Sequence, residues 1–237
     1  MKTILAVFTV VLLSASHVMA ESVPKSLWKS SAELGFVTTS GNTETETLNA
    51  KASVLTDREK WRHKGEITAL KTSDAITTKA EKYTFLVKSD YKLKGKNFLF
   101  GVLTYEDDRF SGYEYRVTEA IGYGRRVIKE KNMTLDLEIG PGSRQSKLDS
   151  GVAESEAMLR AAANYAWTIS KTSKFSEALT VEAGEDVTVS KSVTSLSSQI
   201  EGNLSMKITY TYKNTSEVPV NVEKTDTQTA ITLVYTF

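Results

Sequence analysis

The sequence contains no cysteine and only two histidines in 237 residues. Without cysteine no disulfide bond can stabilise the fold, and the usual ligands of transition metals are scarce. A catalytic triad needs a histidine base. His17 falls in a predicted leader segment, and His63 follows Trp61 by two residues, which places both on one face of a predicted strand. That face is predicted to meet lipid, so we predict no catalytic residue, no metal site and no cofactor.

Long apolar runs are also missing after the first twenty residues. The start, MKTILAVFTVVLLSASHVMA, has a positive charge, an apolar run from Ile4 to Leu13, and the small residues Val18 and Ala20 before a cleavage site. This pattern is typical of a secretory signal peptide, and the run is short for a transmembrane helix. We therefore predict that residues 1–20 are removed and that residues 21–237 are exported as one domain.

An excess of either charge is absent as well. The chain has 30 lysines and arginines against 29 aspartates and glutamates, and loss of the leader removes one lysine. A nearly neutral chain gives no sign of the basic footprint of nucleic-acid-binding proteins, so we predict no nucleic-acid partner. The mean hydropathy of −0.27 excludes a helical membrane protein. It does not exclude a membrane barrel, whose lipid-facing and lumen-facing residues alternate and cancel in the average.

Alternation of apolar and polar residues is what the sequence does contain, almost from end to end. The stretch MTLDLEIG (133–140) sets methionine, leucine and isoleucine on one face and threonine, aspartate and glutamate on the other. The stretches WKSSAELGFVTT (28–39) and EKYTFLVKSDYKL (81–93) behave in the same way. Such alternation predicts half-buried strands. The alanine-rich segment 157–163 favours a helix by propensity, but the alternation around it predicts a strand there too.

The connections between these strands are of two kinds. Short polar turns are predicted at residues 57–60, 94–97, 129–132, 171–173 and 201–203. More variable connections are predicted at residues 41–42, 73–78, 109–112, 147–151, 184–190 and 214–225. This asymmetry is typical of outer-membrane barrels, which have short periplasmic turns and longer outer loops. We therefore predict an all-β fold, a transmembrane antiparallel β-barrel of about twelve strands, in the outer membrane of a Gram-negative bacterium.

Aromatic residues gather near both ends of the predicted strands. Near the short turns lie Trp28, Trp61, Tyr91, Phe98, Trp167, Phe175, Tyr235 and Phe237. Toward the other end lie Phe36, Tyr83, Phe110, Tyr113 and Tyr115. Two such bands predict the interfacial girdles of a membrane barrel.

The chain ends on the alternating stretch TAITLVYTF, in which Ile231, Leu233, Tyr235 and Phe237 share a face. A free C-terminus is usually frayed and polar, whereas this one becomes more aromatic toward its last residue. We interpret it as the signal by which outer-membrane proteins are handed to the barrel assembly machinery. That machinery is then a partner during biogenesis, and outer-membrane lipid and lipopolysaccharide surround the folded barrel.

Several stretches resemble a known family. They are AELGFVTTSGNTETETLNAK, DREKWRH, SDYKL, YEDDRFSGYEYR, GYGRRVI, MTLDLEIGPG and KTDTQTAITLVYTF, and they extend over almost all of the predicted mature chain. They resemble the uncharacterised outer-membrane family known as domain of unknown function 481, which includes proteins described as salt-induced outer membrane proteins. The resemblance implies a β-barrel in the outer membrane. It implies no catalytic or binding residue.

Charged residues of both signs occupy the predicted lumen face. They are Glu33, Lys51, Arg62, Lys64, Glu66, Lys88, Asp90, Arg116, Arg126, Asp136, Glu138, Arg144, Arg160, Glu182 and Lys207. Either they pair into a network that fills the lumen, or they line a narrow polar pore, and the sequence leaves both open. The leading hypothesis is a non-enzymatic barrel, either a narrow channel or a structural, envelope-stress component. The alternative is a carboxylate-based hydrolase or a barrel that binds a lipid or small ligand.

Two local motifs remain. YEDDRFSGYEYR (105–116) either holds a divalent cation together with lipopolysaccharide phosphates or is a solvated hairpin tip. EIGPGSR (138–144) places Pro141 inside a strand, where proline cannot donate to the ladder, and predicts a bulge or bend that re-aims Arg144. The glycines of GYG (122–124) indicate a close approach of backbone or space left in the lumen.

Overall fold

The computed structural model describes the chain except for residues 1–27, 40–44, 75–76, 110 and 221. The predicted signal peptide, residues 1–20, therefore lies outside the described residues, as does Phe110 of the predicted aromatic band. No helix in the described part of the chain is long and apolar enough to cross a membrane.

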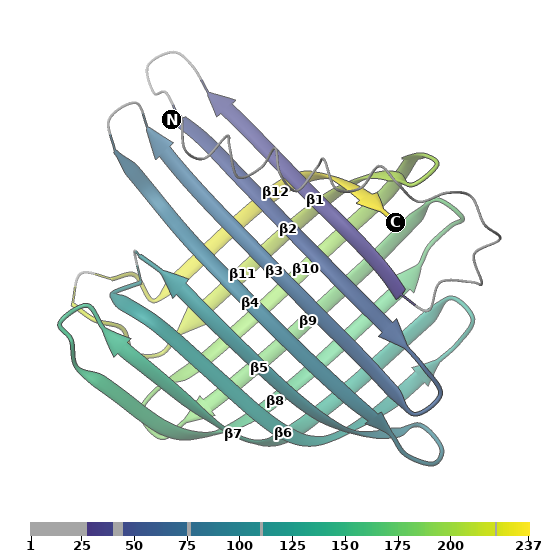
Figure 1. Ribbon diagram of the computed structural model, residues 1–237, viewed down its shortest axis with the longest axis horizontal. Coiled ribbons are helices and arrows are strands. Elements are labelled where there is room, and N and C mark those ends of the chain that lie inside the picture. Colours follow the sequence, from purple (N-terminus) through teal and green to yellow (C-terminus); the bar gives the residue numbers. More distant parts are fainter. Residues whose placement is uncertain (1–27, 40–44, 75–76, 110, 221) are drawn as a thin grey trace.

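The described residues form twelve antiparallel strands joined by short connections (Figure 1). The strands are β1 (Trp28–Thr39), β2 (Thr45–Asp57), β3 (Trp61–Asp74), β4 (Thr78–Lys92), β5 (Asn97–Asp108), β6 (Tyr113–Lys129), β7 (Met133–Leu148), β8 (Ala153–Thr168), β9 (Ser173–Gly184), β10 (Thr188–Glu201), β11 (Leu204–Thr215) and β12 (Thr225–Thr236). Even the shortest has 12 residues, enough for a tilted strand to cross a bilayer. The alanine-rich segment 157–163 lies within β8, so the strand prediction there is confirmed.

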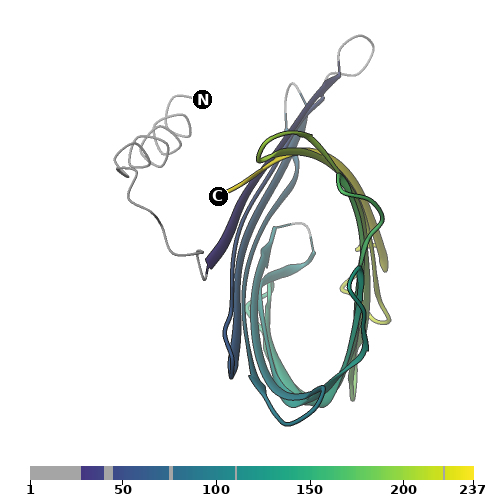
Figure 2. The ribbon, with the colours of Figure 1, turned by 90° about the vertical axis from the view of Figure 1, so that its right-hand side faces the viewer.

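The sheet closes on itself because β1 pairs with β12, and the predicted barrel is confirmed. Closure removes the edges that a long sheet would otherwise expose. The seam between the first and last strands is short. Four residue pairs, from Ser31↔Thr236 to Leu34↔Leu233, join β1 to β12 in the described chain, whereas β1 and β2 pair along the full length of β1. Figure 2 shows a flattened oval barrel, with β6 and β7 at the lower narrow end.

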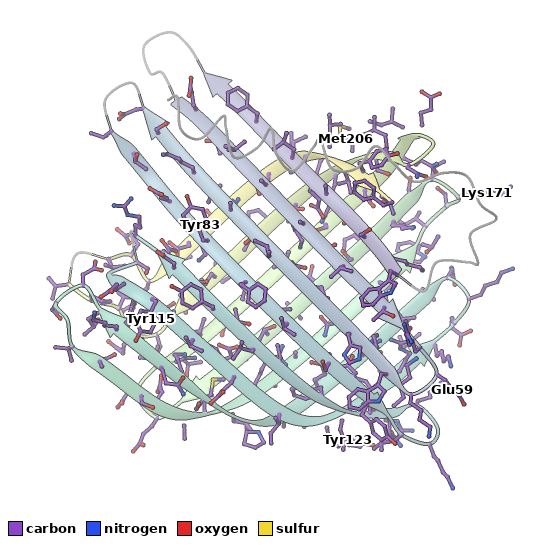
Figure 3. All side chains as sticks on the ribbon, in the orientation of Figure 1. Glu59, Tyr83, Tyr115, Tyr123, Lys171 and Met206 are labelled. Atoms are coloured by element: carbon purple, nitrogen blue, oxygen red, sulfur yellow. The ribbon has the colours of Figure 1, made fainter. Side chains whose placement is uncertain are left out.

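The two ends of the barrel differ in their connections. At the turn end, residues 58–60, 93–96, 130–132, 169–172 and 202–203 join the strands. At the opposite loop end, the connections include residues 149–152, 185–187 and 216–224. Glu59 and Lys171 mark the turn end in Figure 3, and Tyr115 lies toward the loop end. Most loop-end connections are shorter than predicted because the strands continue into them; β10 already begins at Thr188.

The outer surface of the barrel is apolar, as the alternation predicts for a lipid-facing surface. Ile121 and Ile139, for example, are 69% and 53% exposed. Phe98 is a correction to the predicted aromatic band, because it points into the barrel and is 4% exposed. Tyr113 is buried as well, at 6% exposure. A register irregularity lies between Tyr113 and Tyr115, so the two tyrosines do not share one face as the alternation predicts.

Pro141 does not cause the predicted bulge. The register of β6 against β7 is the same before and after it, and β7 continues to Leu148. The glycines beside it instead let the two strands approach closely. A Cβ on Gly140 would lie 2.0 Å from the Ile121 carbonyl oxygen, and one on Gly122 would lie 2.7 Å from the Gly140 Cα. The predicted close backbone approach at GYG is therefore confirmed.

Candidate functional site: the barrel lumen

Six charged residues form one ion-paired network on the inner wall made by β3 to β8. We call it the central ion network, and its members are Arg62, Lys88, Asp90, Asp136, Glu138 and Arg160. Arg62 Nε donates to Asp90 Oδ2 at 2.6 Å, and Arg62 Nη1 lies 3.0 Å from Asp136 Oδ2. Lys88 Nζ donates to Asp90 at 2.6 Å and to Glu138 at 2.7 Å. Arg160 Nη1 donates to Glu138 Oε2 at 3.1 Å. Three positive and three negative side chains thus neutralise one another.

This network connects strands that are not neighbours in the sheet. Lys88 on β4 reaches Glu138 on β7, and Arg62 on β3 reaches Asp136 on β7. The Glu138 side chain is 1% exposed. Such burial is tolerated only when each charge keeps close partners. This part of the lumen is therefore filled by side chains.

An apolar cluster packs against the central ion network inside the barrel. It contains Phe98, Phe100, Val102, Ala120 and Met158, with Leu86 at its margin. The Arg62 guanidinium lies 5.2 Å from the Phe98 ring centre, and Arg160 lies 5.6 Å from that of Phe100. Cations over aromatic faces are attracted by the ring quadrupole. We call the combined surface of network and cluster the packed wall.

The other predicted lumen residues form smaller groups. Lys51 and Lys64 pair with Glu66 at 2.8 and 2.9 Å, and Lys207 donates to both carboxylate oxygens of Glu33 at 3.0 and 3.1 Å. The remaining predicted residues join the margins of the packed wall: Arg126 binds Asp136, Arg144 binds Glu156, Glu182 lies 3.9 Å from Arg160, and Arg116 stacks 4.2 Å from the Tyr113 ring centre.

A further charged group near the loop end was missed by the sequence analysis. Glu106 on β5 accepts from Lys82 on β4 at 2.9 Å and from Lys213 on β11 at 2.8 Å. Because β5 and β11 belong to opposite walls of the oval, the second bond spans the lumen. Lys213 lies six residues after Lys207 on the same strand and therefore on the same inward face. This spacing could have identified Lys213 as a lumen residue.

The charges of YEDDRFSGYEYR pair with residues of neighbouring strands rather than with one another. Glu106 and Asp108 both bind Lys82, and Arg109 binds Glu81 at 2.9 Å. Among the described residues, no group of three or more potential ligands could hold a metal ion. The cation-binding interpretation of this motif is therefore not supported by its geometry.

His63 lies beside its predicted neighbour. Its ring stacks on Trp61 with 5.5 Å between ring centres, and its Nδ1 is 2.9 Å from the Ser89 hydroxyl. Trp61 is 44% exposed. This arrangement suits an interfacial anchor, because an amphipathic ring meets lipid on one side and a polar group on the other.

The inner wall made by β9 to β12 differs from the packed wall because hydroxyl groups dominate it. Its inward hydroxyl residues are Ser176, Thr180, Ser195, Ser197, Thr209, Thr211, Thr232 and Thr236. Several of these, such as Thr209 and Thr211, are half-buried rather than buried. We call this surface the hydroxyl wall. At the turn end it borders a cavity of about 480 Å³ that also reaches Glu33 on β1.

The fold is that of outer-membrane barrels. The structure is similar to the NanC porin, with a TM-score of 0.54 and 11% identity over 88% of this chain and 98% of that one. It is also similar to the COG4313 outer membrane channel from Pseudomonas putida F1, with a TM-score of 0.53 and 9% identity over 93% and 100% of the two chains. A third similar structure is the translocator domain of the autotransporter NalP from Neisseria meningitidis, with a TM-score of 0.51, 10% identity, and 98% and 94% coverage. The protein therefore has the fold of the outer-membrane β-barrel class.

The chain belongs to the family described as "Protein of unknown function, DUF481", which matches residues 32–237. It is 29% identical over 204 residues to the uncharacterized protein YdiY of Escherichia coli (strain K12), covering 85% of this chain and 80% of YdiY. The resemblance seen in the sequence is therefore confirmed.

Proposed function

We propose that this protein is a narrow, non-enzymatic channel of the outer membrane. In this proposal the leader at residues 1–20 directs export, and the turn end faces the periplasm. The observation that carries it is the division of the lumen into two unlike halves. The packed wall is buried and its charges neutralise one another, whereas the hydroxyl wall is polar and partly exposed. A solute path then follows β9 to β12, because half-buried and exposed polar side chains line this wall and border the cavity at its turn end.

The pairing of the carboxylates supports a channel over a hydrolase. A general acid or base must exchange its proton with a bound substrate. Asp90, Glu138 and Glu106 are each held by two cationic side chains instead. The bond between Lys213 and Glu106 also crosses the lumen, so the path is narrow and the conductance small.

Single-channel recording in a planar bilayer tests this proposal. The refolded barrel, checked by heat-modifiable gel migration, should give discrete conductance steps. Ser197→Trp should reduce each step at least two-fold, because the indole would occupy the lumen beside the hydroxyl wall. Leu196→Trp is the matched control: the neighbouring side chain is 47% exposed on the outer surface, and its substitution should leave the conductance unchanged.

The other outcomes would end the proposal. A correctly folded barrel without conductance is plugged, which favours the structural, envelope-stress role. Equal effects of the two tryptophans would mean that the current does not pass along the hydroxyl wall.

A further inference from the structure

The cavity of about 480 Å³ at the turn end has a lining suited to a particular kind of solute. We call it the turn-end vestibule. Seven of its lining side chains carry hydroxyls, two carry amides, and the charged ones are three lysines and one glutamate. Its volume falls within the range of roughly 300–1,000 Å³ typical of small-molecule sites. A pocket of this size, lined by both polar groups and aromatic rings, fits a molecule as large as one or two sugar rings.

Unlike the packed wall, whose positive and negative charges balance, the vestibule has more lysines than carboxylates. Lys207 is neutralised by Glu33, whose two oxygens lie 3.0 and 3.1 Å from its Nζ. Lys171 and Lys174 form no ion pair with any residue that the structure describes, and both are exposed. Two positive charges therefore remain uncompensated at the vestibule, where they would attract an anion.

The register of the strands places Lys174 beside serine hydroxyls, of which Ser197 donates to the Lys174 backbone carbonyl at 3.4 Å and Ser195 lies 3.2 Å from the Thr209 hydroxyl. Lys174 on β9 pairs in register with Ser197 on β10, and Ser197 pairs with Lys207 on β11. One step deeper, Ser176 pairs with Ser195. Neighbouring strands are about 4.8 Å apart, so Lys174 and the Glu33-paired Lys207 flank Ser197 in one row. The Ser176 hydroxyl makes no hydrogen bond with a described residue and is available to a ligand.

We propose that the turn-end vestibule binds small, hydroxylated anions, such as sugar acids or sugar phosphates. The anionic group lies at Lys174 and Lys171, and the ligand hydroxyls bind the serines beside them. This inference rests on the proposed channel, since it names the solutes that the channel takes. Farther toward the loop end, Lys191 pairs in register with Lys213, so positive side chains recur along the hydroxyl wall.

Saturation-transfer NMR on the folded barrel in detergent tests the site without requiring conduction. The probes are glucuronate, glucose 6-phosphate and neutral glucose. Both anions should bind saturably, and glucose at least ten-fold more weakly. Preference for glucuronate would indicate a sugar-acid site, and preference for the phosphate a sugar-phosphate site. Anion binding should largely disappear in 1 M salt, where the Debye length is about 3 Å.

Charge-removing variants locate the binding. Lys174→Gln should weaken anion binding about ten-fold, equivalent to about 1.4 kcal/mol, while glucose binding stays the same. Lys174→Arg should restore most of the affinity. Lys131→Gln removes the same charge in a turn at the same end, outside the vestibule, and should have no effect. If Lys174→Gln fails to fold, Lys171→Gln, which changes an exposed turn residue, takes its place.

Three results would overturn the inference: equal binding of glucose and the anions, equal losses in the Lys174 and Lys131 variants, or no saturable binding at all. The experiments can refute the channel proposal and the binding-site proposal independently of each other. A silent barrel that binds anions retains the site and loses the channel, whereas a conducting barrel that binds none retains the channel alone.

Discussion

Replacement of Glu138 by glutamine should destabilise the barrel far more than a typical change of one charge. The side chain is 1% exposed and accepts from Lys88 at 2.7 Å and from Arg160 at 3.1 Å. Removing one member of a buried ion pair costs about 3–5 kcal/mol, because the partner charge stays buried. Here Lys88 keeps Asp90 and Arg160 keeps Glu182. We therefore expect Glu138→Gln to lower the free energy of unfolding by about 3 kcal/mol, at the lower end of that range.

Urea unfolding of the refolded barrel, followed by tryptophan fluorescence and gel migration, measures this change through the shift in midpoint at constant slope. Glu217→Gln is the matched control. Glu217 pairs with Lys224 at 3.5 Å, but its side chain is 70% exposed, so its loss should cost less than about 1 kcal/mol. If both variants cost the same small amount, water screens the central ion network. The packed wall would then be as open as the hydroxyl wall.

Two further predictions concern the seam and the C-terminus. Gly35→Ala should reduce the yield of heat-modifiable folded barrel, because the new Cβ would lie 2.6 Å from the Ile231 carbonyl oxygen. Gly101→Ala is its control, since the nearest atom there is 4.0 Å away, and equal yields would show that the seam does not depend on close approach. Phe237→Ala should leave refolding in detergent unchanged but lower the amount of barrel in the outer membrane of cells, measured by immunoblot, if this exposed ring serves the assembly machinery. An unchanged amount in cells would contradict that role.

The fold could be predicted from the sequence because alternation survives in nearly every strand. The stretch 133–140 has one apolar and one polar face, and the structure places it within β7. The same argument fails in β5, where Phe98 and Phe100 point inward while Leu99 and Leu103 lie outside. Both faces of this strand are apolar, so the alternation does not show which face points inward. The position of Phe98 near a short turn therefore led to its assignment to the aromatic band.

The sequence did not predict which charged residues pair with each other in the lumen. Alternation assigns a residue to a face, but the bond from Lys88 to Glu138 joins residues 50 positions apart on non-neighbouring strands. The bond from Lys213 to Glu106 joins residues 107 positions apart across the barrel. Such contacts depend on how far the cross-section is flattened, and no local pattern encodes that distance.

The flattening has a local origin that links the glycines to the proposed path. At the narrow end of the oval seen in Figure 2, β6 and β7 approach where Gly122 faces Gly140, and a Cβ on either would meet backbone within 3.0 Å. Without side chains at this bend the sheet can curve sharply between β4 and β7, which brings Lys88 within 2.7 Å of Glu138. The charged half of the lumen is thereby filled, and the space that remains borders the hydroxyl wall. Gly140→Ala should push β6 and β7 apart at this end. We therefore expect it to weaken the contacts of the packed wall and to change the conductance, although it replaces no residue of the proposed path.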